Sequence, residues 1–386
     1  MSDCFLPRLG GIEVQVDDLA RAQRATGHEV RVATATPGEA LPGLVRVGAR
    51  LPWALPVLGS VRRIVADFQP DVVHVHTGVV SPFAWRAMRD CRSVPTVVTV
   101  HSLWGRPTGL AHRRIIPPEA AVTTVSEAAA VPIRRTLGGE VHVVPNGIDT
   151  GPWREIRPWL PTGAVHVVAV GRLAPRKEPF TLLRVLRSAG ARAPIRVTIV
   201  GDGPAAGAIR RYLRRYRMEG WVKLTGRLDR SEVREVLASA DVFVAPARRE
   251  SFGLAALEAR LAGVPVVAHA ASGVADFVRP GREGLLGANT AELSHALVRM
   301  VTDHDLRHTI ASANRSTDSD GCTWPAVLGA FDRIYGTVAR PAVAVSAPAE
   351  TVEEKVEEPA GLYLVRTGHA DAAEAGQDVE GRDVTA

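Results

Sequence analysis

Cysteine and aromatic residues are both scarce in this chain of 386 residues. Three cysteines occur, Cys4, Cys91 and Cys322, and they are odd in number and far apart. They form neither a disulfide framework nor the ligand spacing of a metal site, which suits a reducing compartment. Long hydrophobic runs are missing too: no apolar stretch approaches the roughly 18 residues that span a bilayer, and the N-terminus lacks the apolar region of a signal peptide. We therefore expect a cytoplasmic protein.

The amino-acid composition is typical of a globular protein, except in the C-terminal tail, where it is acidic. Hydrophobic residues make up 46% and charged residues 23%, and the length suits two domains rather than one. Residues 341–386 are rich in Ala, Glu, Pro and Val and hold ten acidic against three basic residues, a net charge of −7. We expect this acidic tail to be disordered.

The first 340 residues carry a net charge of +13, because the whole chain carries +6 and the tail −7. A basic body favours anionic partners such as nucleotide diphosphates, phosphorylated acceptors or an anionic membrane surface. Nucleic acid is a poorer candidate, because the arginines are dispersed along the sequence and no cluster of aromatic and basic residues stands out. Most arginines are expected on solvated helix faces.

Short apolar runs alternate with longer amphipathic segments, a pattern that predicts parallel βαβ units. In the first half the expected strands are 29–34, 71–76, 96–101, 121–125 and 141–144. In the second half they are 164–170, 196–200, 221–225, 241–245 and 265–269. Helical spacing runs from Val14 to Thr26 and ends at Gly27, a plausible C-cap.

The expected fold class is α/β, with two doubly wound domains facing a cleft. The segment 151–161 is rich in Pro and Trp and is interpreted as the linker, and no repeat of 20–50 residues occurs. The expected parts are residues 1–155 as an N-terminal domain, 156–322 as a C-terminal domain, 323–340 as a helix packing back on the N-terminal domain, and 341–386 as the acidic tail.

The start of the chain departs from this pattern. A doubly wound domain opens with a buried strand, yet here the chain reaches Gly10 and Gly11 almost at once. The first strand is therefore expected to be missing, which a start site assigned too far downstream, or a truncated chain, would explain.

The most specific motif follows the expected strand 241–245. Two carboxylates, Glu250 and Glu258, stand eight residues apart. A helix is expected to open between them with Ser251, Phe252, Gly253 and Leu254. Its N-terminus directs unpaired amides and a positive dipole end at a diphosphate. Glu250 can reach sugar hydroxyls and Glu258 a ribose diol, whereas the alternative is a surface loop with a solvated Glu258. Two features favour the ligand site: the glycine that lies between the two carboxylates, and the expected strand that precedes the motif.

A second motif follows the expected strand 164–170. Gly171 allows a tight strand exit, and Arg172 and Lys177 can bracket a diphosphate, Arg as a planar fork and Lys as a point charge. Such a pair would stabilise the charge that develops on a leaving nucleotide. The alternative is two surface cations at a helix start.

Weaker signals stand in the first half. Gly10 and Gly11 precede a helix and allow close approach to a phosphate, although Glu13 as a simple N-terminal helix charge explains them as well. His101 ends an apolar strand; such histidines are more often hydrogen-bonded core residues, but strand C-termini face the ligand crevice of open α/β sheets. The turn 145–149 is interpreted as structural.

The stretch Gly201–Ala206 matches a dinucleotide-binding fingerprint but is discounted. No acidic residue ends the next expected strand, and Pro204 has no amide hydrogen to offer a pyrophosphate. It is interpreted as a structural turn that could line the nucleotide base.

Taken in order, these motifs resemble the retaining glycosyltransferases of family 4, which have the GT-B fold. The resemblance runs from about Phe5 to Val338. It implies a nucleotide-sugar donor, UDP- or GDP-linked, held mainly by the C-terminal domain, an unidentified acceptor held mainly by the N-terminal domain, retention of configuration, and no metal or other cofactor.

By this resemblance the expected catalytic residues are Glu250 at the donor sugar, His101 near the transferred sugar, and Arg172 with Lys177 at the diphosphate. The expected donor-binding residues are Gly10, Gly11, Arg172, Lys177, Ser251, Phe252, Gly253, Leu254 and Glu258. One departure is Asp276, which stands where the family usually has Glu, so its role is in doubt. The departing phosphate is expected to help deprotonate the acceptor in a front-face substitution.

Several questions stay open at this point. The acceptor could be a glycolipid, a polysaccharide, or a sugar or inositol phosphate. The segment 51–68 could give weak contact with an anionic membrane, although an ordinary core helix is the favoured interpretation. Rival functions are a nucleotide-sugar epimerase of the same architecture, a catalytically silent module, and an NAD-dependent oxidoreductase.

Overall fold

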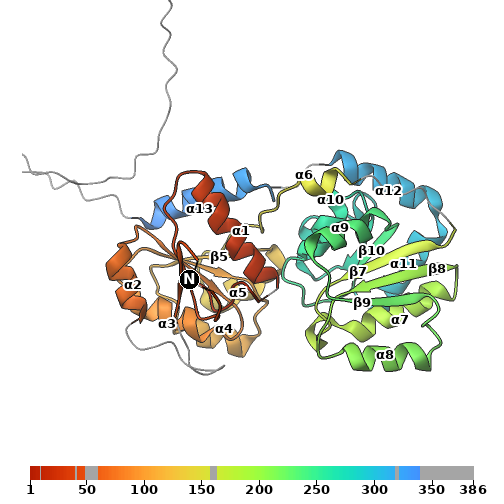
Figure 1. Ribbon diagram of the computed structural model, residues 1–386, viewed down its shortest axis with the longest axis horizontal. Coiled ribbons are helices and arrows are strands. Elements are labelled where there is room, and N and C mark those ends of the chain that lie inside the picture. Colours follow the sequence, from red (N-terminus) through yellow and green to blue (C-terminus); the bar gives the residue numbers. More distant parts are fainter. Residues whose placement is uncertain (9, 40, 48–59, 157–162, 318–320, 340–386) are drawn as a thin grey trace, which may run out of the picture. The chain divides into compact units, whose positions relative to one another are not determined.

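The structure is a computed structural model that describes residues 1–8, 10–39, 41–47, 60–156, 163–317 and 321–339. All the described residues belong to one compact unit, Met1–Pro341. This unit contains two parallel β-sheets with helices packed against them, as Figure 1 shows.

The first sheet is parallel, with the strand order β3-β4-β5-β6. Its strands are β3 (Val73–Thr77), β4 (Thr96–Val100), β5 (Ala121–Thr124) and β6 (His142–Val143). A separate parallel pair consists of β1 (Val32–Thr34) and β2 (Leu44–Arg46). All these strands except β2 overlap the expected runs, because Val and Thr suit both faces of a buried parallel strand.

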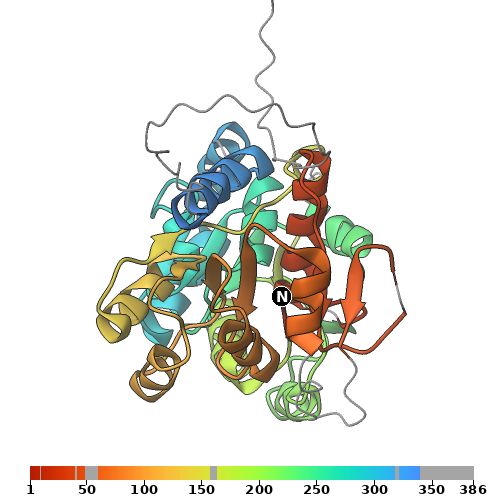
Figure 2. The same ribbon diagram turned by 90° about the vertical axis from the view of Figure 1, so that its left-hand side faces the viewer.

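The chain start lies between the pair and the sheet, where an opening strand would run (Figure 2). No named strand occurs in residues 1–8, as the sequence predicts, but Ser2 forms single parallel bridges to Thr34 on one side and His76 on the other. The Ser2 amide donates to the Ala33 carbonyl at 3.0 Å, and the His76 amide donates to the Met1 carbonyl at 2.8 Å. A two-residue segment thus joins β1 to β3.

Six helices belong with the first sheet: α1 (Gly11–Ala25), α2 (Ser60–Phe68), α3 (Pro82–Asp90), α4 (Arg106–Arg113), α5 (Glu127–Leu137) and α13 (Trp324–Val338). α1 begins three residues earlier than the expected helix and is followed by Gly27 in a left-handed conformation, φ 94°. α13 returns from the far end of the sequence and packs against α1 and β4. The contact is made by a buried cluster of Leu19, Val97, Val144, Val327, Leu328, Phe331 and Ile334.

The second sheet is also fully parallel, with the order β12-β11-β10-β7-β8-β9. Its strands are β7 (Val165–Val170), β8 (Ile195–Val200), β9 (Val222–Gly226), β10 (Val242–Ala245), β11 (Val266–His269) and β12 (Gly284–Gly287). The order reverses at β7, and such a switch point is where open α/β sheets bind ligands. Both sheets together confirm the expected α/β fold class.

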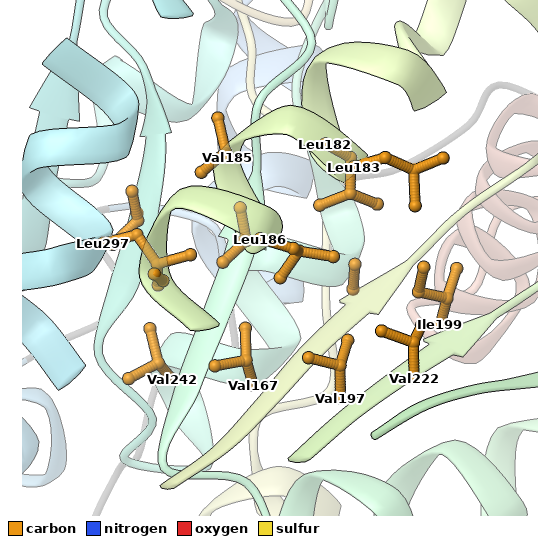
Figure 3. Packing of buried hydrophobic residues seen from close by; sticks show 14 of the residues in the cluster. Val167, Leu182, Leu183, Val185, Leu186, Val197, Ile199, Val222, Val242 and Leu297 are labelled. Carbon is orange, nitrogen blue, oxygen red and sulfur yellow. The ribbon is translucent and has the colours of Figure 1, made fainter. Parts of the chain in front are cut away.

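Helices cover both faces of the second sheet. One face is packed by α7 (Pro179–Gly190), α8 (Ala206–Arg215) and α11 (Thr290–Thr302). Figure 3 shows side chains of α7, such as Leu183 and Leu186, meeting Val167 and Val197 of β7 and β8. The other face is packed by α9 (Arg230–Ala238) and α10 (Leu254–Leu261), and the remaining helical elements are α6 (Gly151–Arg154), α12 (His304–Ser316) and the short 3₁₀ helices η1 (Pro175–Lys177) and η2 (Gly273–Asp276).

The first part of the segment 151–161, which the sequence analysis interprets as the linker, is folded. Gly151–Arg154 forms α6, and Trp153 is 1% exposed within the core beside α10. A tryptophan in a Pro-rich stretch is thus a core residue rather than part of a solvated connection. Residues 157–162 lie outside the described part of the chain, so the boundary at 155/156 stays a prediction.

The described helices give no support for a membrane span, because none of them is both long and apolar enough to cross a bilayer. Of the segment 51–68, residues 51–59 lie outside the described part. The remainder forms α2, in which Val61 is buried against the first sheet.

Candidate functional site

The two expected ligand motifs meet at the carboxyl edge of the second sheet. β7 leads toward η1, which ends at Lys177, and β10 leads into the loop that holds Glu250. The exits lie side by side because β7 and β10 are neighbouring parallel strands. The Lys177 ammonium donates a hydrogen bond to the Glu250 carboxylate, and both side chains are partly buried. The residue expected to bind the diphosphate and the residue expected to bind the sugar are therefore in contact.

A second link joins the same two loops. Glu178 has a left-handed backbone, φ 50°, and its carboxylate accepts a hydrogen bond from the Arg248 amide at 3.2 Å. Arg172 follows the exit of β7 directly and is exposed. The loop after β7 thus carries three cations, Lys177 paired with Glu250, and Arg172 and Arg176 exposed to solvent.

A glycine turn after β8 supports the loop after β7. Gly201 has φ 132°, and a Cβ atom there would lie 2.0 Å from the Gly171 carbonyl oxygen. A Cβ atom on Gly203 would lie 2.4 Å from the Leu173 carbonyl oxygen. The stretch that resembles a dinucleotide fingerprint therefore packs backbone against backbone, which agrees with its interpretation as a structural turn.

Close backbone packing also fixes the start of α10. Gly253 is the N-cap residue, with φ 94°, and a Cβ atom there would lie 2.5 Å from a methyl carbon of Val274. The amide of Gly273 donates to the Glu250 carbonyl at 2.8 Å, and a Cβ atom on Gly273 would lie 2.2 Å from the Ser251 carbonyl oxygen. Glycines at 253 and 273 thus let the loop of Glu250 sit against η2.

The Gly273→Ala variant is expected to lose about 1–3 kcal/mol of unfolding free energy, because the added carbon meets backbone that cannot rotate away. Donor turnover should fall with it, since the displaced atoms belong to the loop of Glu250. Urea unfolding and donor hydrolysis measure the two effects. Gly336→Ala in α13 is the control: its Cβ would meet nothing within 4 Å, and alanine favours a helix. A Gly273→Ala protein as stable as the parent would contradict this packing.

The remaining two residues of the expected helix start differ in exposure. Phe252 is 3% exposed and packs against Phe277, with ring centroids 5.4 Å apart. Its side chain therefore lies in the core, so that only its backbone could contact a donor. Leu254 is the first residue of α10 and is partly buried.

His101 lies directly after β4, against the same loop. The Ser251 hydroxyl donates to the His101 carbonyl at 2.6 Å, and the His101 Nε2 lies 2.9 Å from Nδ1 of His76 on β3. Burial lowers the pKa of His101 to about 4 and holds the pKa of His76 well below 6.5. Both rings are neutral at pH 7, so one donates and the other accepts, and His101 is a hydrogen-bonding group rather than a cation.

Glu258 is buried on the second turn of α10, with 8% of its surface exposed. Its carboxylate lies 3.6 Å from the guanidinium of Arg230, the first residue of α9, and Arg230 also lies 3.4 Å from Asp18 of α1. Burial raises the pKa of Glu258 to about 7, although Arg230 lowers it. The alternative interpretation of Glu258 as a solvated helix carboxylate is therefore wrong.

Gly10 and Gly11 stand at the N-terminus of α1, where the space beside Gly10 is filled and the space beside Gly11 is open. A Cβ atom on Gly10 would lie 2.4 Å from Oε2 of Glu13, and the Glu13 carboxylate pairs with Arg8 at 3.1 Å. The first turn of α1 thus faces a carboxylate of its own chain.

The turn 145–149 has structural partners. The Gln15 amide, oriented to satisfy both its atoms, accepts from the Gly147 amide at 2.9 Å and donates to the Gly147 carbonyl at 3.2 Å. The Ile148 amide donates to the Cys322 carbonyl at 2.8 Å. The turn therefore joins α1 to the segment that leads into α13.

Asp276 has a partner that sequence reasoning did not find. Its carboxylate accepts a hydrogen bond at 2.6 Å from the Glu127 amide, at the first residue of α5. Burial raises the pKa of Asp276, although this hydrogen bond lowers it. An acidic residue at a helix N-terminus is favourable, and nothing in the sequence pattern indicated which helix Asp276 would meet.

In the described part of the chain no group of three or more His, Cys, Asp or Glu side chains could hold a metal ion. Cys91 and Cys322 are buried, and burial raises the pKa of Cys91 to about 11. The polar groups that converge at the sheet edge are instead suited to hydrogen bonding and to an anion.

Two family profiles match consecutive stretches of the chain. The profile described as Glycosyltransferase Family 4 matches residues 9–151. The profile described as Glycosyl transferases group 1 matches residues 156–317. The two stretches include the first and the second sheet respectively.

Individual relatives align over most of the chain. A GDP-mannose-dependent alpha-mannosyltransferase of Mycobacterium tuberculosis is 28% identical over 388 residues, which cover 87% of this chain and 96% of the relative. A D-inositol 3-phosphate glycosyltransferase of Actinosynnema mirum is 29% identical over 387 residues, with coverage of 85% and 92%.

Solved structures share the fold. A sucrose-phosphate synthase from Thermosynechococcus elongatus superposes with a TM-score of 0.71 at 21% identity, covering 85% of this chain and 93% of that one. Anabaena Alr3699/HepE, solved in complex with UDP-glucose, superposes with a TM-score of 0.71 at 18% identity, covering 86% and 98%.

Proposed function

Because this chain belongs to the family 4 glycosyltransferases, which have the GT-B fold and transfer a hexose from a nucleotide-sugar, we propose that it takes the sugar of a UDP- or GDP-linked donor and transfers it with retention of configuration. The observation that carries the proposal is the contact of Lys177 with Glu250 beside the start of α10. A cation and a carboxylate thus lie next to a helix N-terminus, which supports a leaving diphosphate bound at this position.

The proposed roles are those that the family resemblance implies, and the geometry of the site supports them. Lys177 and the exposed Arg172 hold the negative charge that grows on the leaving diphosphate as the glycosidic bond breaks. Glu250 accepts hydrogen bonds from the donor sugar, and Glu258 accepts from the ribose diol in its ionised form. His101, neutral at pH 7, offers a hydrogen bond to the transferred sugar. The leaving phosphate itself takes the acceptor proton on the same face of the sugar.

The acceptor side is proposed only by class. A relative named for D-inositol 3-phosphate supports a sugar or inositol phosphate acceptor, and the basic body suits a phosphorylated molecule. A glycolipid or polysaccharide is the alternative. We propose reaction without a metal or other cofactor, in the cytoplasm or at the inner face of the cell membrane, and without nucleic acid as a partner.

Thermal unfolding with added nucleotide tests the donor proposal. UDP or GDP at about a hundred times its Kd should stabilise the folded chain by roughly 2.7 kcal/mol, whereas NAD should leave the unfolding temperature unchanged. EDTA should not alter the shift. Stabilisation by NAD and by neither diphosphate would contradict the proposal and favour the oxidoreductase.

Turnover distinguishes a transferase from an epimerase and from a silent module. A transferase hydrolyses a nucleotide-sugar slowly and releases free nucleotide, an epimerase converts the donor sugar without releasing nucleotide, and a silent module binds nucleotide but does neither. A screen of UDP- and GDP-linked sugars for nucleotide release, followed by NMR of the product anomer, would also test retention.

A further inference from the structure

Positive charge is concentrated on one pair of helices. Residues 184–217 contain nine arginines and one aspartate, a net charge of +8, out of +13 for the first 340 residues. They include most of α7 and all of α8, which lie on the same face of the second sheet (Figure 1). The expectation that arginines are dispersed along the chain is wrong for this stretch.

The arginines of these helices point away from the core. Seven exposed guanidinium groups define what we call the α7–α8 face: Arg184, Arg187, Arg210, Arg211, Arg214, Arg215 and Arg217. Throughout the described ranges, none of the seven pairs with a carboxylate. The charge of this face is therefore not neutralised by its own chain.

Aromatic rings lie among these arginines. Phe180 and Tyr216 are 38% and 40% exposed, and Tyr212 lies between them with ring centroids 6.1 Å from Phe180 and 4.4 Å from Tyr216. The Arg187 guanidinium lies over the Tyr216 ring at 4.3 Å. Arginine next to exposed aromatic rings is a combination suited to the interface between water and lipid headgroups.

We propose that the α7–α8 face binds the surface of an anionic lipid bilayer. Arginine forms bidentate hydrogen bonds to phosphate, and attraction to an anionic leaflet adds up over neighbouring basic residues. The apolar side of α8 packs into the protein core and is not available to lipid, because Ile209 and Leu213 are buried there. The helix therefore lies on the headgroups without inserting, and its binding depends on salt.

Single-stranded nucleic acid fits this face less well. Binding of single strands relies on aromatic rings with free faces on which bases stack. Here the Tyr216 ring carries Arg187 on one side and contacts Tyr212. Stacking a base would require both contacts to open, whereas a planar anionic surface needs only the outward guanidinium groups.

The proposal is independent of the transfer reaction and places membrane contact on a different segment from 51–68. Its test is flotation of the full chain with vesicles of phosphatidylcholine alone, and with vesicles of phosphatidylcholine and phosphatidylglycerol in a two-to-one ratio. We expect binding to the anionic vesicles only, reversed by raising the salt concentration. Replacing Arg210, Arg211 and Arg214 by Gln should weaken that binding about a hundredfold.

A charge-matched control replaces three exposed arginines near the first sheet, Arg113, Arg114 and Arg135, by Gln. This variant should bind within a few-fold of the parent, and both variants should keep the parent unfolding temperature and donor hydrolysis rate. Equal loss in both triple variants would overturn the proposal, because net charge alone would then explain binding. So would absence of binding at low salt, or tight binding to single-stranded RNA without binding to vesicles.

Discussion

The Lys177→Ala variant is expected to lose about 10²–10³ in kcat/KM for transfer, because an electrostatic contact to the leaving group is worth that much. The structure adds a second effect, since removal of the ammonium leaves the partly buried Glu250 carboxylate without its partner. Steady-state kinetics with donor and acceptor, or donor hydrolysis alone, measure the loss. Arg176→Ala is the control, because Arg176 is the exposed neighbour of Lys177 in η1.

Comparison of the Lys177→Ala and Glu250→Ala single variants with the double variant shows whether the two side chains act together. If Lys177 and Glu250 act as a unit, Glu250→Ala alone should cost nearly as much as the double variant, and the two losses should not add. Wild-type kcat/KM in Lys177→Ala or Glu250→Ala would remove the basis of the proposed function. Unfolding temperatures close to that of the parent are needed to show that both variants fold.

Glu258→Gln is expected to stabilise the protein above pH 7 while weakening donor binding. The folded chain raises the pKa of Glu258 from 4.5 to about 7 through burial. Between these values the folded state binds more protons than the unfolded state, so stability falls as pH rises through this window and stays lower above it. The difference amounts to about 3 kcal/mol. The Gln variant, which carries no titrating group, should lack this loss.

Unfolding temperatures of both proteins from pH 4.5 to pH 8 measure the effect. The parent should lose several degrees relative to Glu258→Gln over that range. Donor affinity should change in the opposite sense, because the ribose diol donates to the carboxylate: parent affinity rises with pH near 7, and the variant stays flat and weaker. A nucleotide-sugar is the right probe, since its phosphates do not titrate there. Parallel stability curves for the two proteins would contradict the assigned pKa.

Most strands of the fold could be predicted from local patterns of apolar and β-branched residues. Every expected strand overlaps an observed one, because runs such as Thr96–Val100 combine β-branched residues with complete burial. Two strands were missed for identifiable reasons. β2 has only three residues, all partly exposed. β12 begins with Gly284, whose missing side chain allows it to approach the Val266 carbonyl, where a Cβ atom would lie 1.9 Å away.

The candidate site was partly accessible from sequence. Gly171 marks the exit of a strand and Gly253 the start of a helix, so both positions could be predicted from local rules. The contact of Ser251 with the His101 carbonyl and that of Asp276 with the Glu127 amide could not, because each joins residues about 150 apart in the sequence. The buried environment of Glu258 is of the same kind: it depends on Arg230 from another helix.

The packing of the turn at Gly201 and Gly203 against the loop after β7 explains how a familiar motif can mislead. Both glycines are required by a neighbouring piece of main chain, which leaves no volume for a side chain. A bound nucleotide that approaches the backbone closely would also require glycine at these two positions. The glycines alone therefore do not distinguish nucleotide binding from backbone packing. Here the packing of the loop that carries Arg172 accounts for both glycines, so the motif does not by itself indicate a dinucleotide.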